Sequence, residues 1–462
     1  MAIRILPYRN KKTYRVFVDT VKIMYLRNRK EVENKHKTES TMNIIFITLS
    51  NINGIAERGI YADLMRKFRD EGHQVYIVSP TERRNGEPTH IIEDDGAKIL
   101  KVRTLNIQKT NVVEKGIGTL LIEGQFKRAI NRYFGDVKFD LILYSTPPIT
   151  FTNVVCYLKR KNQTSISYLL LKDIFPQNAV DIGLLQGKPV QGSRFKVQGW
   201  VACGKYLLYK YFRNKEKKLY AASDYIGCMS PANVEYVRKH NPYYPADHVE
   251  VAPNSIDLSP NLNANDNLNR YAIREKYGLP TDKPIFIYGG NLGKPQGIPY
   301  LIQCLEANKQ RNDCHFVMVG NGTEYHRLLL WYEQNANRNV TLMQRMPKVD
   351  YDLLVRVCDV GMIFLDHRFT IPNYPSRLLS YLENQMPVIC ATDANTDIGC
   401  IAEENDYGYW CESANPADFT VLVDRMLSSD RQAMGKRGYE YLRKNYLVQN
   451  TYDAIMKHFK ER

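Results

Sequence analysis

The fold is decided by residues 42–54, Met-Asn-Ile-Ile-Phe-Ile-Thr-Leu-Ser-Asn-Ile-Asn-Gly, an apolar run that ends in a polar loop with a glycine. A short apolar run bounded by turn-forming residues predicts a buried β-strand. Downstream, Ile60, Leu64 and Phe68 recur at four-residue spacing within 55–71, which predicts an amphipathic helix. A buried strand, a loop and a covering helix form the repeating unit of α/β folds with parallel sheets.

This unit recurs through the rest of the chain, where short apolar strands alternate with amphipathic helices. The first helix is expected to stop at Gly72, because glycine is the usual residue just beyond a helix end. The alternation pauses at 253–284, which is rich in Pro, Asn and Asp and predicts a linker region. We predict two α/β domains at 42–255 and 256–430 and a helical tail at 431–462. The predicted strands are 43–48, 74–79, 97–103, 139–144, 165–171, 224–229, 248–252, 285–289, 315–320, 339–343, 359–364, 387–391 and 407–410.

The positive charge of the chain is concentrated in two segments. The 462 residues include 64 Lys and Arg against 49 Asp and Glu, a formal net charge of +15. Residues 1–41 hold 11 basic and 4 acidic residues, and residues 191–218 hold 8 basic residues and one acid. Such an excess indicates an anionic partner, which nucleic acid, phosphorylated substrates and anionic lipid all satisfy. Residues 1–41 are either a leader that is not native, with translation starting at Met42, or a membrane-facing arm, and the first interpretation is favoured.

Cysteine use and hydropathy exclude several classes of protein. The nine cysteines form no Cys-x-x-Cys pair and lie mostly in apolar strands, which favours buried, reduced thiols and a cytoplasmic location. No Cys and His cluster has the spacing of zinc ligands, so a zinc site is not expected. We also expect no cofactor. No apolar run reaches about 18 residues, and no segment has the form of a secretory signal, so we expect no transmembrane helix.

Two glycine-containing loops follow predicted strands, where ligands of open α/β domains bind. Gly54 lies after the first strand, and residues 288–297 contain four glycines, which allow backbone to approach a ligand closely. Lys294 supplies a point charge for a phosphate. The P-loop pattern G-x-x-x-x-G-K-[ST] is absent, which argues against a P-loop NTPase. Taken alone, the Gly54 loop is also consistent with an ordinary strand–helix turn.

Two further loops complete the set. The turn Gly320-Asn321-Gly322 suits a nucleotide base or ribose nearby, although any tight turn has this composition. Within 371–382, Ser376 is expected to cap a helix. The start of that helix, together with Arg377, predicts an anion site, against the simpler interpretation of a capped surface helix.

In order and spacing these segments resemble glycosyltransferase family 4, whose members have the GT-B fold. The resemblance extends over about residues 42–445. Within it, residues 172–177 and 290–297 resemble the branch that builds bacterial capsule and O-antigen repeats, including fucosamine-type transferases. The resemblance is carried by Asn51–Gly54, Ala252–Asp257, Gly289–Gly297, Gly320–Gly322, Pro375–Leu382 and Met386–Val388.

The resemblance implies two Rossmann-like domains whose parallel sheets face each other across the active-site cleft. The N-terminal domain would bind a lipid-diphosphate-linked glycan acceptor, the C-terminal domain a UDP-sugar, and the tail would cross back to the N-terminal domain. It also implies retention of anomeric configuration without a metal, so that Lys294 and Arg377 would stabilise the departing diphosphate. The implied donor-binding residues are Gly54, Gly290, Asn291, Lys294, Gly320, Asn321, Tyr374, Ser376, Arg377, Ser380 and Glu383.

The sequence departs from the family pattern in the residues expected to hold the donor. Asn291 and Gln296 stand where many members have Arg and Lys, and Lys294 is the candidate substitute. The family's pair of glutamates seven residues apart aligns with Pro372 and Ser380, so both carboxylates are missing. Ser380 can still bond a ribose hydroxyl, and Glu383, one turn later on the helix, is a second candidate.

Asp173 follows the predicted strand 165–171 and would face the cleft from the N-terminal domain. It is assigned as the base that activates the acceptor, or as a contact to a sugar hydroxyl, and a helix-capping role before Pro176 is nearly as well supported. His367, after strand 359–364, is a weaker candidate for the cleft, because a lone histidine is more often structural.

The basic segment 191–218 interleaves its cations with aromatic and aliphatic residues. This composition suits an anionic membrane surface, and RNA is the other class of partner. We find no nucleic-acid-binding signature, so no nucleic acid partner is expected. A helix packed on the first domain is the simplest interpretation. The predicted membrane or acceptor contacts are Trp200, Lys205, Lys210 and Arg213, on a protein that lies peripherally on the inner face of the cytoplasmic membrane.

Three functions therefore remain open from the sequence. The first is a retaining glycosyltransferase of hexosyl or N-acetylhexosaminyl type in surface polysaccharide synthesis. The second is a non-hydrolysing UDP-sugar epimerase, which shares the fold but needs acid/base residues that we cannot place. The third is an inactive scaffold of a polysaccharide assembly complex, suggested by the missing carboxylate pair.

Overall fold

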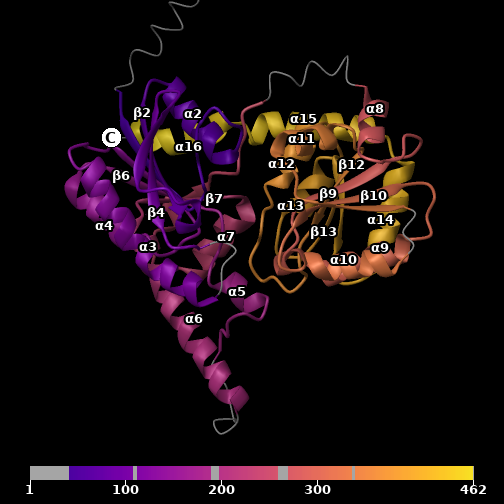
Figure 1. Cartoon of the computed structure of the whole chain (residues 1–462), viewed down its shortest axis with the longest axis horizontal. Coiled ribbons are helices and arrows are strands. Elements are labelled where there is room, and N and C mark those ends of the chain that lie inside the picture. The colour runs from indigo at the N-terminus through magenta and orange to yellow at the C-terminus, as the bar shows by residue number, and fades with distance from the viewer. Residues whose placement is uncertain (1–40, 108–111, 189–196, 259–268, 336–338, 461–462) are drawn as a thin grey trace, which may run out of the picture.

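A computed structural model of the chain describes residues 41–107, 112–188, 197–258, 269–335 and 339–460. The basic segment 1–40 and residues 189–196 of the second basic segment lie outside the described residues. The described chain forms two α/β units, each built around one sheet (Figure 1).

The N-terminal sheet has eight strands in the order β3-β4-β2-β1-β5-β6-β7-β8. All neighbours pair in parallel except β3, which runs antiparallel to β4. Buried side chains cover both faces of this sheet, as expected for parallel strands. The strands are β1 (Asn43–Ile47), β2 (Gln74–Glu82), β3 (His90–Asp94), β4 (Ala97–Thr104), β5 (Leu141–Ser145), β6 (Ile166–Leu171), β7 (Tyr225–Cys228) and β8 (Val249–Val251).

The C-terminal sheet has six strands in the order β11-β10-β9-β12-β13-β14, and each of the recorded pairings is parallel. Its two faces are likewise covered by apolar clusters. The order reverses beside β9, and in such sheets ligands bind outside the carboxyl ends of the strands at this point. The strands are β9 (Ile285–Asn291), β10 (His315–Asn321), β11 (Val340–Gln344), β12 (Val360–Phe364), β13 (Val388–Thr392) and β14 (Gly408–Glu412).

Helices lie on both sides of each sheet (Figure 1). In the N-terminal unit they are α2 (Ile60–Asp70), α3 (Val112–Tyr133), α4 (Thr152–Lys161), α5 (Gln177–Asp181), α6 (Val197–Ala222) and α7 (Pro231–His240). The C-terminal unit contains α8 (Arg270–Lys276), α9 (Ile298–Asn308), α10 (Tyr325–Gln334), α11 (Lys348–Arg356), α12 (Arg377–Glu383), α13 (Ile398–Glu404) and α14 (Pro416–Ser428). The tail forms α15 (Arg431–Asn445) and α16 (Val448–Lys460). Short 3₁₀ turns occur at Arg83–Asn85, Ala246–His248 and Lys294–Gln296.

The predicted fold class is confirmed: two parallel-sheet α/β domains with the GT-B arrangement. Every predicted strand is present within a few residues of its expected bounds. The first helix begins at Ile60 instead of 55, and Gly72 follows its end with φ 89°, the left-handed conformation expected there. The segment 253–284, predicted as a linker, contains helix α8.

The sequence analysis missed β3, the antiparallel edge strand. Its burial alternates between partly buried and exposed residues, because only one face of this edge strand is covered. The search for continuous apolar runs detects strands that are buried on both faces and therefore overlooks one of this kind.

The chain crosses between the two units twice, and the two crossings lie side by side. The Ile256 N–H donates to the Tyr446 carbonyl at 3.0 Å, and the Val448 N–H donates to the Ile256 carbonyl at 3.0 Å. Beyond this point α16 packs on α2, whereas α15 packs on α12. Phe369 and Ile371, from the loop after β12, are buried in the apolar cluster of the N-terminal unit. The two units are therefore joined by packed side chains as well as by the crossings.

Candidate functional site

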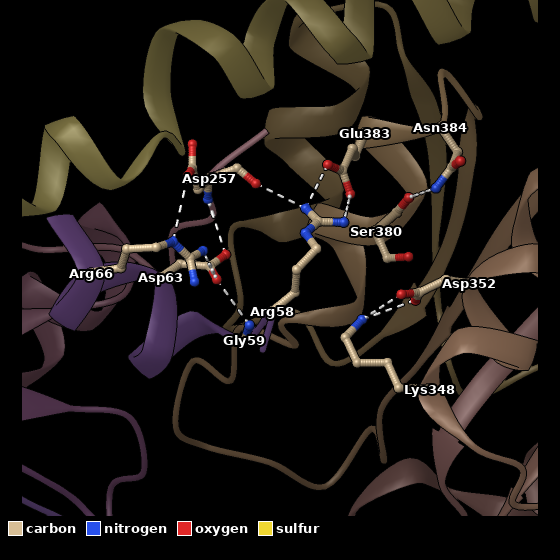
Figure 2. Close-up of polar contacts among 10 residues, drawn as sticks. All are labelled: Arg58, Gly59, Asp63, Arg66, Asp257, Lys348, Asp352, Ser380, Glu383 and Asn384. Atoms are coloured by element: carbon tan, nitrogen blue, oxygen red, sulfur yellow. Dashed lines mark hydrogen bonds and ion pairs between the residues drawn. The ribbon is translucent and has the colours of Figure 1, made fainter. Parts of the chain in front are cut away.

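A pocket of about 150 Å³ lies at the boundary of the two units, where three of the predicted donor-binding residues meet residues of the N-terminal unit. Helix α12 contributes one wall, helix α11 a second, and the segment that leads into α2 a third (Figure 2). The pocket is lined by Arg58, Gly59, Ile60, Asp63, Ile256, Lys348, Asp352, Arg356, Ser376, Leu379, Ser380, Glu383 and Asn384.

An ion pair between the units crosses this pocket. The Arg58 guanidinium donates to both oxygens of the Glu383 carboxylate, Nη1 to Oε2 at 3.1 Å and Nη2 to Oε1 at 2.6 Å (Figure 2). The Glu383 side chain is only 6% exposed. Burial acts to lower the pKa of Arg58, and the hydrogen bond and charge of Glu383 outweigh it, so the pKa lies above its usual value. Glu383, predicted to bind ribose, is thus held by an arginine of the other unit.

The same arginine fixes the first crossing between the units. Arg58 Nη2 donates to the Asp257 carbonyl at 2.8 Å, and the Asp257 N–H donates to Asp63 Oδ2 at 3.0 Å (Figure 2). Asp63 is 1% exposed, and its other oxygen accepts hydrogen bonds from the Gly59 N–H and the Arg66 guanidinium. Both backbone polar groups of Asp257 are therefore bound by side chains of the N-terminal unit.

Arg377 lies beneath the glycine-rich loop, next to a predicted donor-binding glycine. Its guanidinium carbon is 4.3 Å from the centre of the Tyr288 ring. A Cβ built on Gly290 would lie 3.5 Å from Arg377 Nη2, so the loop backbone rests against the guanidinium. Arg377 Nη1 is buried and has no hydrogen-bond partner among the described residues. A buried N–H without an acceptor is costly, so this atom suits an anionic ligand that supplies one.

The predicted glycines are required by packing. A Cβ on Gly320 would lie 1.9 Å from the Gly290 carbonyl oxygen, because the ends of β9 and β10 approach closely. A Cβ on Gly54 would lie 2.7 Å from a carboxylate oxygen of Asp94, which accepts the N–H groups of Ile55 and Ala56. These contacts account for glycine at both positions without a ligand.

The rest of the glycine-rich loop presents polar groups at the surface. Lys294 is exposed in its 3₁₀ turn, as are Asn291 and Asn321 at the ends of β9 and β10. Asn291 Nδ2 donates to Gln296 Oε1 at 3.0 Å. The two residues that replace the family's basic side chains therefore stabilise the loop through a bond to each other.

In the loop before α12, Tyr374 is buried and the capping bond predicted for Ser376 is absent. Tyr374 is 6% exposed and its hydroxyl lies 2.5 Å from that of Tyr446, so it packs the tail onto the C-terminal unit. Ser376 occupies the N-cap position, but its side chain makes no capping hydrogen bond. Ser376 and Ser380 both line the boundary pocket, and Ser380 is drawn in Figure 2.

Asp173 lies between the end of β6 and α5, in a partly buried position. The N–H groups of Lys172 and Asp173 both donate to Thr146 Oγ1, at 2.9 and 3.1 Å, and Asn178 Nδ2 donates to Asp173 Oδ1 at 2.5 Å. Burial raises the pKa of Asp173 to about 6, and the Asn178 hydrogen bond opposes that rise only in part. Helix α5, which follows, reaches the other unit through Asp181 and Thr370.

The weaker candidate His367 is half exposed and lies 3.9 Å from Asp366. No hydrogen bond joins Asp173 to Arg377 or Lys294 among the described residues. The structure therefore gathers Ser376, Ser380 and Glu383 into one pocket and leaves Asp173 in the N-terminal unit.

Two residues of the N-terminal unit were missed by the sequence analysis. Arg58 is four residues beyond the quoted Gly54 loop, and its partner is 325 positions away, so no local spacing reveals the pair. Lys101 interrupts the apolar strand β4 and is 2% exposed. Its Nζ donates to the Ile52 carbonyl, Asn53 Oδ1 and Ser79 Oγ, each at 3.0 Å, and burial lowers its pKa to about 8. A lysine inside an apolar strand was the signal available in the sequence.

Residues 197–218 of the second basic segment lie in the long helix α6, whose first turns extend beyond the body of the N-terminal unit (Figure 1). Its C-terminal half packs inward through Leu219 and Tyr220, which are buried. Arg213 is one of the predicted contacts to the membrane or the acceptor. Its guanidinium is instead bound within the protein, to Glu216 and to Asn241. Trp200 lies in the first turn of α6, and its side chain is outside the described residues.

The exposed stretch of α6 combines apolar residues and lysines. Val201, Leu207, Leu208 and Tyr211 are 56%, 61%, 45% and 41% exposed, respectively. The predicted contact Lys210 is exposed and lies over the Tyr206 ring, and Lys205 donates to the Gly183 carbonyl at 3.2 Å.

Two other kinds of feature are absent from the described ranges. No helix there is both long and apolar enough to cross a membrane. No group of three His, Cys, Asp or Glu side chains in the same ranges is placed to hold a metal ion.

The comparisons with known families and curated proteins point to glycosyltransferases. Residues 269–441 match the family model described as Glycosyl transferases group 1. The chain is 21% identical over 287 residues to the glycosyltransferase-named protein WbjE of Pseudomonas aeruginosa, a match that covers 60% of this chain and 64% of that protein. It is 29% identical over 136 residues to WcaI of Escherichia coli K12, named for colanic acid biosynthesis, a match that covers 29% and 32% of the two chains. The matches thus span at most 64% of these relatives.

The solved structures with a similar fold extend the comparison to the whole chain. Sucrose-phosphate synthase from Thermosynechococcus elongatus matches with a TM-score of 0.66 and 15% identity over 91% of this chain and 98% of that one. HepE from Anabaena, solved with UDP, matches with a TM-score of 0.58 and 12% identity over 91% and 100% of the two chains. At such identities the likeness shows the fold alone. The chain therefore contains a Glycosyl transferases group 1 domain within a GT-B fold.

Proposed function

We propose that the protein is a retaining glycosyltransferase that transfers a sugar from a UDP-linked donor to a lipid-linked glycan in surface polysaccharide synthesis. The observation that carries the proposal is the boundary pocket, because Ser376, Ser380 and Glu383 of the matched domain line it together with residues of the other unit. The names of WbjE and WcaI and the UDP complex of HepE support the choice of reaction and nucleotide.

In this proposal the donor diphosphate lies beside the glycine-rich loop. Arg377 Nη1 offers a buried N–H group that has no acceptor among the described residues. Lys294 offers an exposed ammonium in the 3₁₀ turn of the glycine-rich loop. Cations fixed before the reaction stabilise the charge that develops on the departing diphosphate, so these residues take the place of a metal. Ser380 contacts the ribose, and Asp173 takes the proton of the acceptor hydroxyl.

The proposal is tested by thermal unfolding with a panel of nucleoside diphosphates and nucleotide sugars. UDP at 100 times its dissociation constant should raise the free energy of unfolding by about 2.7 kcal/mol, because it binds only the folded chain. A donor should then be turned over only when a lipid-linked acceptor is present. Binding of a partner transferase without any nucleotide shift would favour a scaffold. Conversion of a UDP-sugar without acceptor would favour an epimerase.

We also propose that the exposed part of α6 holds the protein on the anionic inner face of the cytoplasmic membrane. The apolar residues Val201, Leu207 and Leu208 would enter the headgroup region, while the neighbouring lysines contact anionic lipid. This position would bring the N-terminal unit to a lipid-linked acceptor.

Replacing Lys205, Lys210 and Lys215 by Gln should weaken binding to vesicles that contain anionic lipid by roughly 100-fold, since each lysine near such a surface contributes about 1 kcal/mol. Co-sedimentation measures this effect. Arg213 is left intact because it is bound within the fold. The matched control replaces Lys276, Lys309 and Lys436 of the C-terminal unit and the tail, which removes the same charge. Equal loss in both triple variants would contradict a role for α6.

A further inference from the structure

The Arg58–Glu383 pair places opposite charges from two units at the wall of the proposed donor pocket. Glu383 is at the end of α12, the helix that begins with Arg377, and Ser380 is one turn before it. Arg58 comes from the segment just before α2 in the other unit. Whatever fixes Glu383 therefore also fixes the helix that carries three proposed donor-binding residues.

The electrostatics of the pocket require a cation at this position. The Glu383 side chain is 6% exposed and lines the pocket, and a buried carboxylate without a counter-charge there would disfavour an anionic nucleotide. Arg58 binds both of its oxygens and neutralises it. The other charged pair in the pocket, Lys348 and Asp352, lies within α11 and is already neutral by itself.

Arg58 neutralises Glu383 only when the two units lie together, because it also binds the segment that joins them. The same guanidinium holds the Asp257 carbonyl at the first crossing, and Asp63 holds the Asp257 N–H (Figure 2). If the units moved apart, Arg58 would have to leave either Glu383 or Asp257. The pair is therefore complete only while α12 lies against the N-terminal unit.

We propose that Arg58 is a positioning residue for nucleotide binding. It neutralises Glu383 and fastens α12 to the N-terminal unit, so that the pocket beside Ser376 and Ser380 accepts a nucleoside diphosphate only when the units are closed. The inference rests on the proposed function and adds to it a residue of the N-terminal unit that acts through α12 without touching the reacting atoms.

The test is a charge reversal in the full chain, read by UDP titration calorimetry and by small-angle X-ray scattering. Arg58→Glu places two carboxylates opposite each other, and Glu383→Arg places two guanidiniums there. Each single variant should bind UDP at least tenfold more weakly and show a larger radius of gyration. The double variant restores the opposite-charge pair but not the donor to the Asp257 carbonyl, so it should recover a large part of both properties, a rescue that a merely structural contribution of either side chain would not produce.

The matched control is Arg69→Glu on helix α2, which follows Arg58; the partners of Arg69, Asp70 and Asp95, belong to the N-terminal unit. It should bind UDP like the wild type. The inference is overturned if the single variants bind UDP with unchanged affinity, or if the double variant regains compactness without regaining UDP affinity. If the wild-type protein binds no nucleoside diphosphate, the proposed function fails first and the inference fails with it.

Discussion

Replacing Asp173 by Asn should lower kcat by about 100-fold to 10,000-fold, the range expected when a general base is removed. The amide keeps the size of the side chain but cannot accept a proton. In the wild type, kcat/KM should fall as the pH drops below about 6, because the pKa of Asp173 lies there and the protonated carboxyl is inactive. The variant should lack this acid limb. Initial rates over pH 5 to 8 with a lipid-linked acceptor measure both effects.

The stability of the same variant separates catalysis from misfolding. Because burial raises the pKa of Asp173 from 3.8 to about 6, the folded chain binds more protons than the unfolded chain between these values. The contribution of this group to the free energy of unfolding therefore falls as the pH rises through that window. Asn has no charge to bury. Asp173→Asn should therefore unfold at a higher temperature than the wild type at pH 7.5, where the buried carboxylate of the wild type is ionised. A stabilised variant with unchanged kcat would assign Asp173 to the fold alone.

The sequence was most informative where burial leaves a continuous apolar run. Strands such as Leu141–Ser145 and Val388–Thr392 are buried at every position, so their composition alone identifies them. The edge strand His90–Asp94 alternates instead, and it was overlooked. The rule that ligands bind beyond the carboxyl ends of parallel strands then located the glycine-rich loop and the start of α12.

The site was less predictable, because spacing along the chain does not report which way a side chain turns. Tyr374 is among the predicted donor-binding residues, and nothing in the sequence indicates that its hydroxyl lies next to that of Tyr446 in the tail. Arg213 seemed a surface cation, yet it is bound to Glu216. The pairing of Arg58 with Glu383 depends on how two separately folded units meet, and a local pattern carries no information on that.

Replacing Arg377 by Met should weaken UDP binding by about 100-fold and lower kcat by a further 10-fold or more. Hydrogen bonds to a charged group contribute about 1.5–3 kcal/mol each, and Met keeps the apolar stem while removing the guanidinium. The loss in kcat follows because the charge on the diphosphate grows as the sugar leaves. Arg377→Lys should recover only part of the affinity, because an ammonium cannot make the paired contacts of a guanidinium. Calorimetry with UDP and steady-state kinetics measure the two losses.

Arg425 supplies the matched control, since it too lies over a tyrosine ring, 3.9 Å from the centre of Tyr409, on α14. Arg425→Met removes the same charge and a comparable ring contact, so its UDP affinity should stay at the wild-type level. The difference in UDP affinity between the two variants measures how much an arginine beneath Gly290 contributes to UDP binding. An Arg377→Met protein that binds UDP as tightly as Arg425→Met would show that the buried Nη1 does not meet a phosphate, and the diphosphate would then have to lie elsewhere in the cleft.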